Sequence, residues 1–177
     1  MIKSAILTLL ATAALTACSP TYNWRDYSSQ DAPYRVMFPD KPSVHKRSID
    51  IGGATVEMTM TAVDVDGAIF AVGSAQAPDA AKAQAALASM KTALVNNIGA
   101  TVTQEKTAAA AAVSGGSGTQ GASIDMEATG ARNGVPMKLI GHFESRDKRF
   151  YQVIVMGKAS KIPREQADQF LSSFKLL

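Results

Sequence analysis

The stretch Phe150-Tyr151-Gln152-Val153-Ile154-Val155-Met156 is an almost continuous run of aromatic and β-branched apolar residues. Such a short run is typical of a strand that is buried on both faces. The charged segment Arg146-Asp147-Lys148-Arg149 stands directly before it and has the composition of a turn. We therefore expect residues 150–156 to form the central strand of a sheet, around which the rest of the domain is built.

The segments before this strand predict a meander. Two apolar sets alternate with polar residues there, namely Met137, Leu139, Gly141 and Phe143, and Ile124, Met126 and Ala128. Asn133-Gly134 lies between the two sets, and this pair favours a two-residue hairpin turn of type I′. The sequence therefore predicts three consecutive antiparallel strands that end in residues 150–156.

Four further strands are expected in the N-terminal half. Tyr22 to Tyr27 can form an initial strand, and Tyr34 to Phe38 places Tyr34, Val36 and Phe38 on one face at period two. Pro39 ends this second strand. Ile69 to Val72 is continuously apolar, which again indicates a buried strand.

The segment from Val56 to Val65 shows a change of phase. From Val56 to Ala62 apolar residues alternate with polar ones, which predicts a half-buried strand with one solvent-exposed face. Val63 and Val65 then become the apolar pair, and a β-bulge near Ala62 would account for the slip. Asp66-Gly67 is a hairpin-turn signal at the end of this segment.

Two segments show helical periodicity. The first spans residues 79–98, with Asp79 as its N-cap and Gly99 as its C-terminal cap. The second is short, residues 163–173, and begins at Pro163 with Phe170 and Phe174 in its apolar stripe. The alanine-rich residues 101–113 between the helices fit either a strand or a loop. The sequence therefore predicts an α+β fold, an antiparallel sheet flanked by helices, in a single globular domain over residues 22–177.

The beginning of the chain resembles a bacterial lipoprotein signal peptide. A basic start and a short apolar stretch lead to Leu15-Thr16-Ala17-Cys18, a lipobox pattern whose Cys18 is the only cysteine. The apolar stretch is too short for a transmembrane anchor, and an ordinary secretory signal does not require the cysteine. The resemblance implies removal of residues 1–17, lipidation of Cys18 and a short tether, residues 18–21. Ser19, which is not Asp, implies sorting to the outer membrane, facing the periplasm.

Most of the remaining chain resembles the PsbP/Mog1-like superfamily. Three motifs carry the resemblance: Tyr34-x-Val36-x-Phe38-Pro39-x-x-Pro42, Phe150 to Val155, and Phe170-x-x-Ser173-Phe174-x-Leu176. All the matching residues are core or turn residues. The resemblance implies an α/β/α sandwich and accessory, assembly or partner-binding roles, and it supplies no catalytic motif. A shared fold does not by itself establish a function.

Candidate chemistry is sparse. His142 and Glu144 share one strand face and could act as an acid–base or metal pair, but His45 is the only other histidine. The run from Asp64 to Gly67 lacks the remaining positions of a calcium loop and is better explained as a turn. The segment from Ser114 to Gly121 lacks the ending of a phosphate-binding loop and is expected to be flexible. Met58 and Met60 are expected in the core. We therefore predict no catalytic residue, cofactor or metal site.

Two basic clusters are the surface candidates. Lys46 and Arg47 belong to the first, with Lys41 and His45 nearby, and Arg146, Lys148 and Arg149 form the second. Basic residues in loops and at hairpin tips commonly serve solubility, but near a bilayer they also attract anionic headgroups. The formal net charge of the whole chain is only +3. This value does not indicate nucleic-acid binding.

Two classes of function remain open. The first is a monomeric, non-catalytic binding or assembly-accessory module, anchored through Cys18 and contacting another envelope protein or anionic headgroups. The second is a periplasmic ligand carrier or enzyme with a pocket between sheet and helix. An exposed apolar patch favours the first class, and a deep pocket with converging polar groups favours the second. The missing catalytic constellation favours the first.

Overall fold

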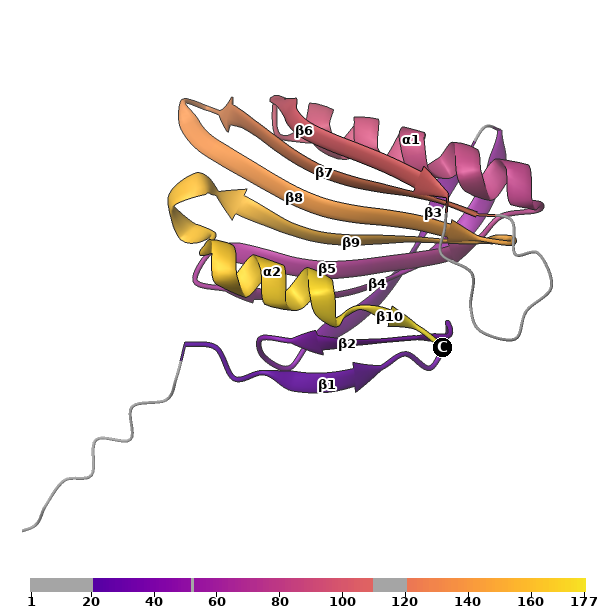
Figure 1. The fold of residues 1–177 in the computed structure, drawn as a ribbon, viewed down its shortest axis with the longest axis horizontal. Helices are drawn as coiled ribbons and strands as arrows, with labels where there is room; N and C mark the ends of the chain where they lie inside the picture. The colour runs from indigo at the N-terminus through magenta and orange to yellow at the C-terminus, as the bar shows by residue number, and fades with distance from the viewer. Residues whose placement is uncertain (1–20, 52, 110–120) are drawn as a thin grey trace, which may run out of the picture.

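The computed structural model describes residues 21–177 except residue 52 and residues 110–120 (Figure 1). The elements in chain order are β1 (Arg25–Ser28), β2 (Tyr34–Phe38), β3 (Ser43–Ile51), β4 (Ala54–Val65), β5 (Ala68–Gln76), α1 (Ala80–Asn97), β6 (Ala100–Ala109), β7 (Gly121–Arg132), β8 (Val135–Arg146), β9 (Arg149–Lys158), α2 (Arg164–Ser173) and β10 (Lys175–Leu176). The expected signal peptide, Cys18, most of the tether and residues 114–120 of the expected loop lie outside the described residues, whereas Gly121, the last residue of that expected loop, begins β7.

The strands form two antiparallel sheets. The larger has seven strands in the order β3-β4-β5-β9-β8-β7-β6, and the smaller has three in the order β1-β2-β10. β9, which contains the apolar run from Phe150 to Met156, is the middle strand of the larger sheet, as predicted. β7, β8 and β9 form the predicted meander through consecutive hairpin pairings.

Helix α1 carries the chain across the larger sheet, from β5 near its middle to β6 at its edge. Asp79 is the N-cap, and its Oδ1 accepts a hydrogen bond from the Lys82 N–H at 2.8 Å. The helix ends before Gly99, which has φ +58° and donates its N–H to the Asn96 carbonyl. No helix within the described residues is long and apolar enough to cross a membrane.

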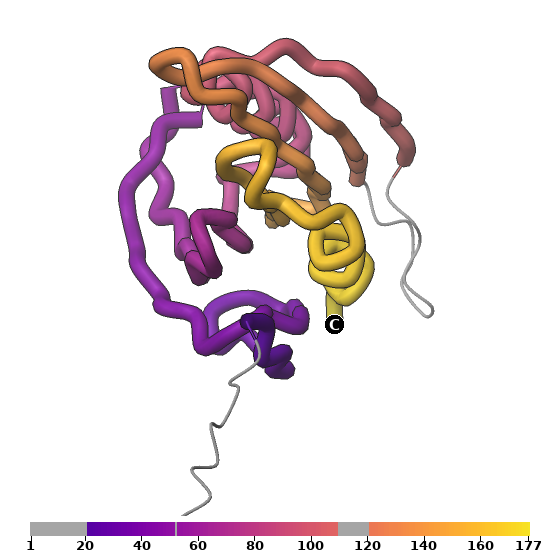
Figure 2. The backbone as a smooth tube through the Cα atoms, turned by 90° about the vertical axis from the view of Figure 1, so that its left-hand side faces the viewer, coloured from indigo at the N-terminus to yellow at the C-terminus, as the bar shows by residue number. Residues whose placement is uncertain are grey.

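The larger sheet has a separate apolar layer on each face (Figures 1 and 2). On one face Leu87 and Met90 of α1 pack with Phe143, Phe150 and Ile154. On the other face α2 and the small sheet enclose an aromatic layer. This layer includes Tyr34, Phe38, Phe70, Tyr151, Phe170 and Phe174. The predicted α+β class, an antiparallel sheet with helices against it, is therefore confirmed.

The hairpin turns follow the residues that favour them. Asn133 and Gly134 have φ of +53° and +77°, and Asp66 and Gly67 have φ of +54° and +84°. Two consecutive residues with positive φ are the requirement of a type I′ turn, which suits the twist of the flanking strands. Both predicted turns are confirmed.

The predicted bulge near Ala62 is wrong. β4 pairs with β3 through Ala62 and with β5 through Val65 without a shift of register. The expected solvent-exposed face of β4 is also partly covered. Glu57 is exposed, but Thr59 and Thr61 are buried, and they contact Asp31 and Tyr34 respectively. The alternation of apolar residues along β4 changes because Met58 packs on the α1 side of the sheet, whereas Val65 packs in the aromatic layer on the other side.

One other segment differs from expectation, and one open alternative is decided by the structure. The basic residues Lys46 and Arg47 were expected in a loop, but Ser43–Ile51 forms β3, the edge strand of the larger sheet. The segment that fits either strand or loop is β6 over Ala100–Ala109, with a register shift between Val102 and Gln104. Both strands lie at sheet edges, where one polar face and unpaired backbone groups weaken the apolar pattern.

Candidate functional site

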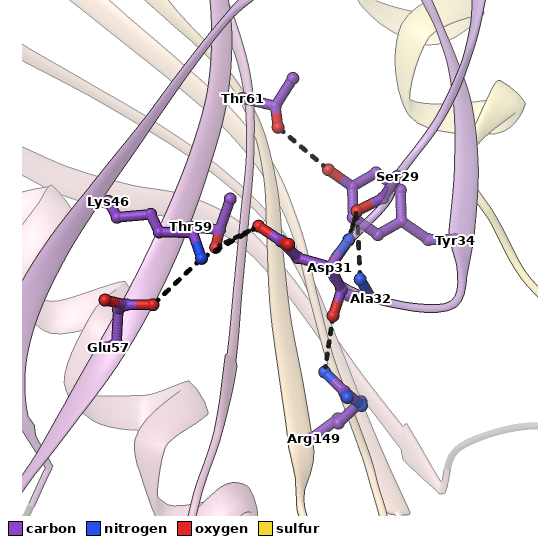
Figure 3. Close-up of polar contacts among 9 residues, drawn as sticks. All are labelled: Ser29, Asp31, Ala32, Tyr34, Lys46, Glu57, Thr59, Thr61 and Arg149. Atoms are coloured by element: carbon purple, nitrogen blue, oxygen red, sulfur yellow. Dashed lines mark hydrogen bonds and ion pairs between the residues drawn. The ribbon is translucent and has the colours of Figure 1, made fainter.

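The loop between β1 and β2 places Asp31 at the centre of a polar cluster (Figure 3). Asp31 Oδ2 lies 3.4 Å from Lys46 Nζ and accepts a hydrogen bond from Thr59 Oγ1 at 3.2 Å. Lys46 Nζ also lies 3.2 Å from Glu57 Oε1. Hydrogen bonding to Glu57 and the charge of Asp31 raise the pKa of Lys46, so its ammonium stays charged. Lys46 therefore links the small sheet to β4.

The same loop approaches the second basic cluster. Ser29 Oγ accepts the N–H groups of Asp31 and Ala32 at 3.3 and 3.2 Å, which orders the turn. The Asp31 carbonyl then accepts a hydrogen bond from Arg149 Nη1 at 3.4 Å. Lys46 and Arg149, which are far apart in sequence, therefore lie on two sides of Asp31 (Figure 3).

A cavity of about 460 Å³ lies beside this loop at the β8–β9 turn. Its lining includes Pro33, Gln76, Tyr151 and Leu176, together with all three residues of the second basic cluster, Arg146, Lys148 and Arg149. Burial raises the pKa of Tyr151 to about 12, so its hydroxyl remains protonated. Guanidinium and ammonium groups around a partly apolar hollow suit an anionic group.

The positive charge of Arg146 is partly neutralised by the Glu144 carboxylate. Its Nη2 donates to Glu144 Oε1 at 2.7 Å. Lys148 is exposed in the turn, and Arg149 is half-buried. Asp147 also lines the cavity, so the positive charges of Lys148 and Arg149 stand beside one carboxylate there.

Arg47 does not join this site. Successive residues of a strand point to opposite faces, so β3 directs Lys46 toward Asp31 and Arg47 toward the α1 side of the sheet. There Arg47 lies at a groove between α1 and strands β3 to β5. The structure thus brings together Lys46, Arg146, Lys148 and Arg149 and separates Arg47. Alternation along β3 could have shown this if the strand had been recognised.

His142 and Glu144 share one face of β8, as predicted. His142 Nε2 lies 3.3 Å from Glu144 Oε2, and Nδ1 lies 2.6 Å from Asp125 Oδ1 on β7. Burial lowers the pKa of His142, but the two carboxylates outweigh burial and the net pKa is raised. The pKa of Glu144 is lowered, because His142 and Arg146 outweigh its burial. These four side chains, Asp125, His142, Glu144 and Arg146, are paired with one another, and we call them the His142 row.

The other residues considered as candidate ligands are accounted for by their places in strands, turns and the core. His45 lies on β3, and three strands separate β3 from β8. Asp64 Oδ1 accepts the Gly67 N–H at 2.9 Å, as a turn requires, and Asp66 pairs with Lys161. No group of three or more acidic, histidine or cysteine side chains in the described parts of the chain is arranged to hold a metal ion. Met58 is in the core, whereas Met60 is half-buried at the groove.

Comparison with known proteins finds no match, either to a protein-family model or to a curated protein.

We predict that the His142 row makes stability depend on pH. A raised pKa means that its contribution is complete below the ordinary histidine pKa of about 6.5 and is lost as pH rises through the higher folded value. Replacing His142 with Gln should therefore cost about 1.5 kcal/mol at pH 6, the lower end of the range for hydrogen bonds to charged groups, and much less at pH 9. Urea unfolding of both proteins at the two pH values measures this. An equal cost at pH 6 and pH 9 would contradict it.

Proposed function

We propose that this chain is a lipid-anchored, non-catalytic binding module of the bacterial envelope. In this proposal Cys18 holds it at the outer membrane, facing the periplasm, and residues 22–177 form one monomeric domain of the PsbP/Mog1-like kind. The lipobox ending in Cys18 supports the anchor. A large antiparallel sheet with one helix on each face is compatible with the family resemblance.

The observation that carries the binding role is the convergence of basic side chains at one end of the domain. Lys46, Lys148 and Arg149 come from two distant segments and surround the Asp31 loop and the adjoining cavity. Sequence proximity accounts for Lys148 and Arg149 but not for Lys46. A basic, partly apolar hollow of this kind suits an acidic segment of another envelope protein.

The basic end lies far from the start of the described chain (Figure 1). Tyr22 lies near the β4–β5 turn, because its ring centroid is 6.3 Å from that of Phe70, close to the start of β5. β5 runs from this turn to Gln76, which pairs with Arg149, over 9 residues. At about 3.4 Å per residue this is about 30 Å. In Figure 1 the described chain begins at the left, and the β8–β9 turn lies at the right. This arrangement favours a partner in the periplasm over headgroups of the anchoring membrane.

A charge reversal at Lys148 tests the proposal. We expect Lys148→Glu to reduce recovery of the crosslinked partner from native membranes about tenfold, the effect of about 1.4 kcal/mol. Lys158→Glu is the matched control, because Lys158 is exposed at the opposite end of the same strand. Quantitative mass spectrometry after crosslinking and affinity purification gives the readout. Equal recovery with both variants would refute the basic end as the binding surface. Lys148-dependent binding to protein-free anionic vesicles would instead assign it to headgroups.

A second candidate function is a ligand carrier, and one observation favours it. The groove between α1 and strands β3 to β5 has a volume of about 610 Å³. This lies within the range of about 300–1,000 Å³ that small-molecule sites occupy. The groove is on the α1 face of the larger sheet, whereas Lys46 points to the other face. The two candidate functions therefore use different surfaces and can be tested separately.

A further inference from the structure

The groove exists because α1 covers only part of its sheet face. The helix buries Ala83, Ala86 and Leu87 against the sheet, chiefly over β7, β8 and β9. Beyond its other flank, side chains of β3, β4 and β5 remain half-buried, among them Ile49, Met60 and Ile69. The opening is therefore a trough with the sheet as its floor and α1 as one wall.

Small residues and methionines shape the floor of the trough. Ala62 and Ala71 line it with short side chains. Gly73 has none, and a Cβ there would lie 2.3 Å from Met58 Cε and 2.8 Å from Met60 Sδ. The methionine side chains therefore occupy the space over the glycine. Methionine is flexible and polarizable, so such a floor adapts to an apolar chain of variable shape.

One buried amide interrupts this apolar surface. Gln152 lies on the central strand, lines the trough and is only 3% exposed. Its Nε2 donates to Met60 Sδ at 3.7 Å, and a thioether is a weak acceptor. A buried amide is costly unless it is well hydrogen-bonded. An apolar wall with a few placed polar groups is the usual composition of a small-molecule site.

The rim of the trough carries a cation. Arg47 projects to this side from β3 and is exposed. No acidic side chain among the described residues forms an ion pair with it. Asp50 also lines the trough, but its Oδ1 accepts the Gly53 N–H at 3.1 Å in the β3–β4 turn. The trough therefore combines an apolar floor with a positive charge at its mouth.

We propose that this trough binds a free, single-chain fatty acid. The alkyl chain lies over Met58 and Met60 along the sheet, and the carboxylate pairs with Arg47 at the rim. This arrangement buries the apolar chain and leaves the charged head at the surface, where its desolvation costs least. The proposal specifies the ligand of the carrier role and does not depend on the acidic partner at the basic end.

The test uses the full chain in isolated native membranes. A palmitic-acid analogue with a diazirine and a terminal alkyne is added, the sample is irradiated, and labelled peptides are mapped by mass spectrometry. We expect labelling of peptides from β4 and from the second half of α1. Ala93→Phe should reduce it about tenfold, the effect of about 1.4 kcal/mol, because Ala93 lines the trough from α1.

Matched controls separate filling of the trough from general damage. Ala85→Phe adds the same ring at an exposed position of the same helix and should leave labelling unchanged. Arg47→Glu should also reduce labelling about tenfold, the same 1.4 kcal/mol, whereas Lys46→Glu on the opposite face should not. Trypsin resistance equal to that of the unmodified protein shows that each variant is folded.

The outcomes distinguish the proposals. Labelling spread evenly over the surface, or equal labelling of the Ala93→Phe and Ala85→Phe proteins, would overturn the fatty-acid site. Labelling that is insensitive to Arg47→Glu in folded protein would also overturn it, since the carboxylate would not be at the rim. Lys148→Glu should leave labelling intact, so failure of the partner-binding proposal leaves this one standing, and the reverse also holds.

Discussion

Replacing Cys18 with Ser is expected to abolish lipidation of the protein completely. Cys18 is the only thiol in the chain, so no other side chain can form the thioether that the lipobox implies. Without the lipid the signal peptide should also remain uncleaved, because lipoprotein processing follows lipidation. Metabolic labelling with an alkynyl fatty acid, followed by intact mass measurement, should show an unlabelled precursor. Two or more acyl chains hold a protein stably at a bilayer, which a single chain does not.

Ser19→Ala is the matched control for the anchor. It changes a neighbouring small polar residue and leaves the thiol, so labelling should persist at the unmodified level. Covalent label that survives in the Cys18→Ser protein would show that lipidation is elsewhere or that the lipobox interpretation is wrong. Because residues 1–20 lie outside the described structure, this experiment tests the sequence argument directly.

The Phe170→Ala protein is expected to lose about 3–5 kcal/mol of its free energy of unfolding, as truncation of a buried phenylalanine typically does. Phe170 is fully buried, and its ring centroid lies 5.2 Å from that of Phe38 and 5.4 Å from that of Phe70. It thus joins α2 to both sheets. A domain has only about 5–15 kcal/mol in total. The urea midpoint should therefore fall severely.

Gln169→Ala provides the comparison on the same helix. Gln169 is half-buried beside Phe170, and we expect its truncation to change stability by about 0.5 kcal/mol or less, as surface substitutions usually do. Urea midpoints of the two variants, measured under one set of conditions, decide the matter. Equal midpoints would mean that α2 does not pack on the sheets through Phe170, and the family resemblance would lose one of its three motifs.

Local rules made part of the fold predictable. Type I′ turns need two residues that accept positive φ, so Asn133-Gly134 and Asp66-Gly67 marked their hairpins. Asp79 and Gly99 marked the ends of α1, because capping depends on the residue at the helix end. The apolar run of β9 identified the central strand, because only a strand covered on both faces tolerates such a run.

The failures involve contacts between distant segments. The phase change in β4 was attributed to a bulge, whereas it reflects coverage of the Thr61 face by the small sheet, where Tyr34 Oη lies 3.2 Å from Thr61 Oγ1. No pattern within residues 56–65 indicates that the segment 25–38 covers the Thr61 face of β4 in the folded protein. Likewise β3 was missed because its exposed charges conceal the alternation, and its pairing with β4 decides that it is a strand.

The sequence by itself determined the turn positions, the helix ends and the central strand, and it supplied the evidence for an anchor at Cys18, because each depends on residues that are neighbours in the chain. Only the tertiary structure decided which basic residues lie close together. It placed Lys46 and Arg149 on two sides of Asp31 and directed Arg47 to the trough under α1. The physical reason is that strand alternation separates chain neighbours by the thickness of a sheet, while sheet pairing and loop packing join residues that the sequence keeps far apart.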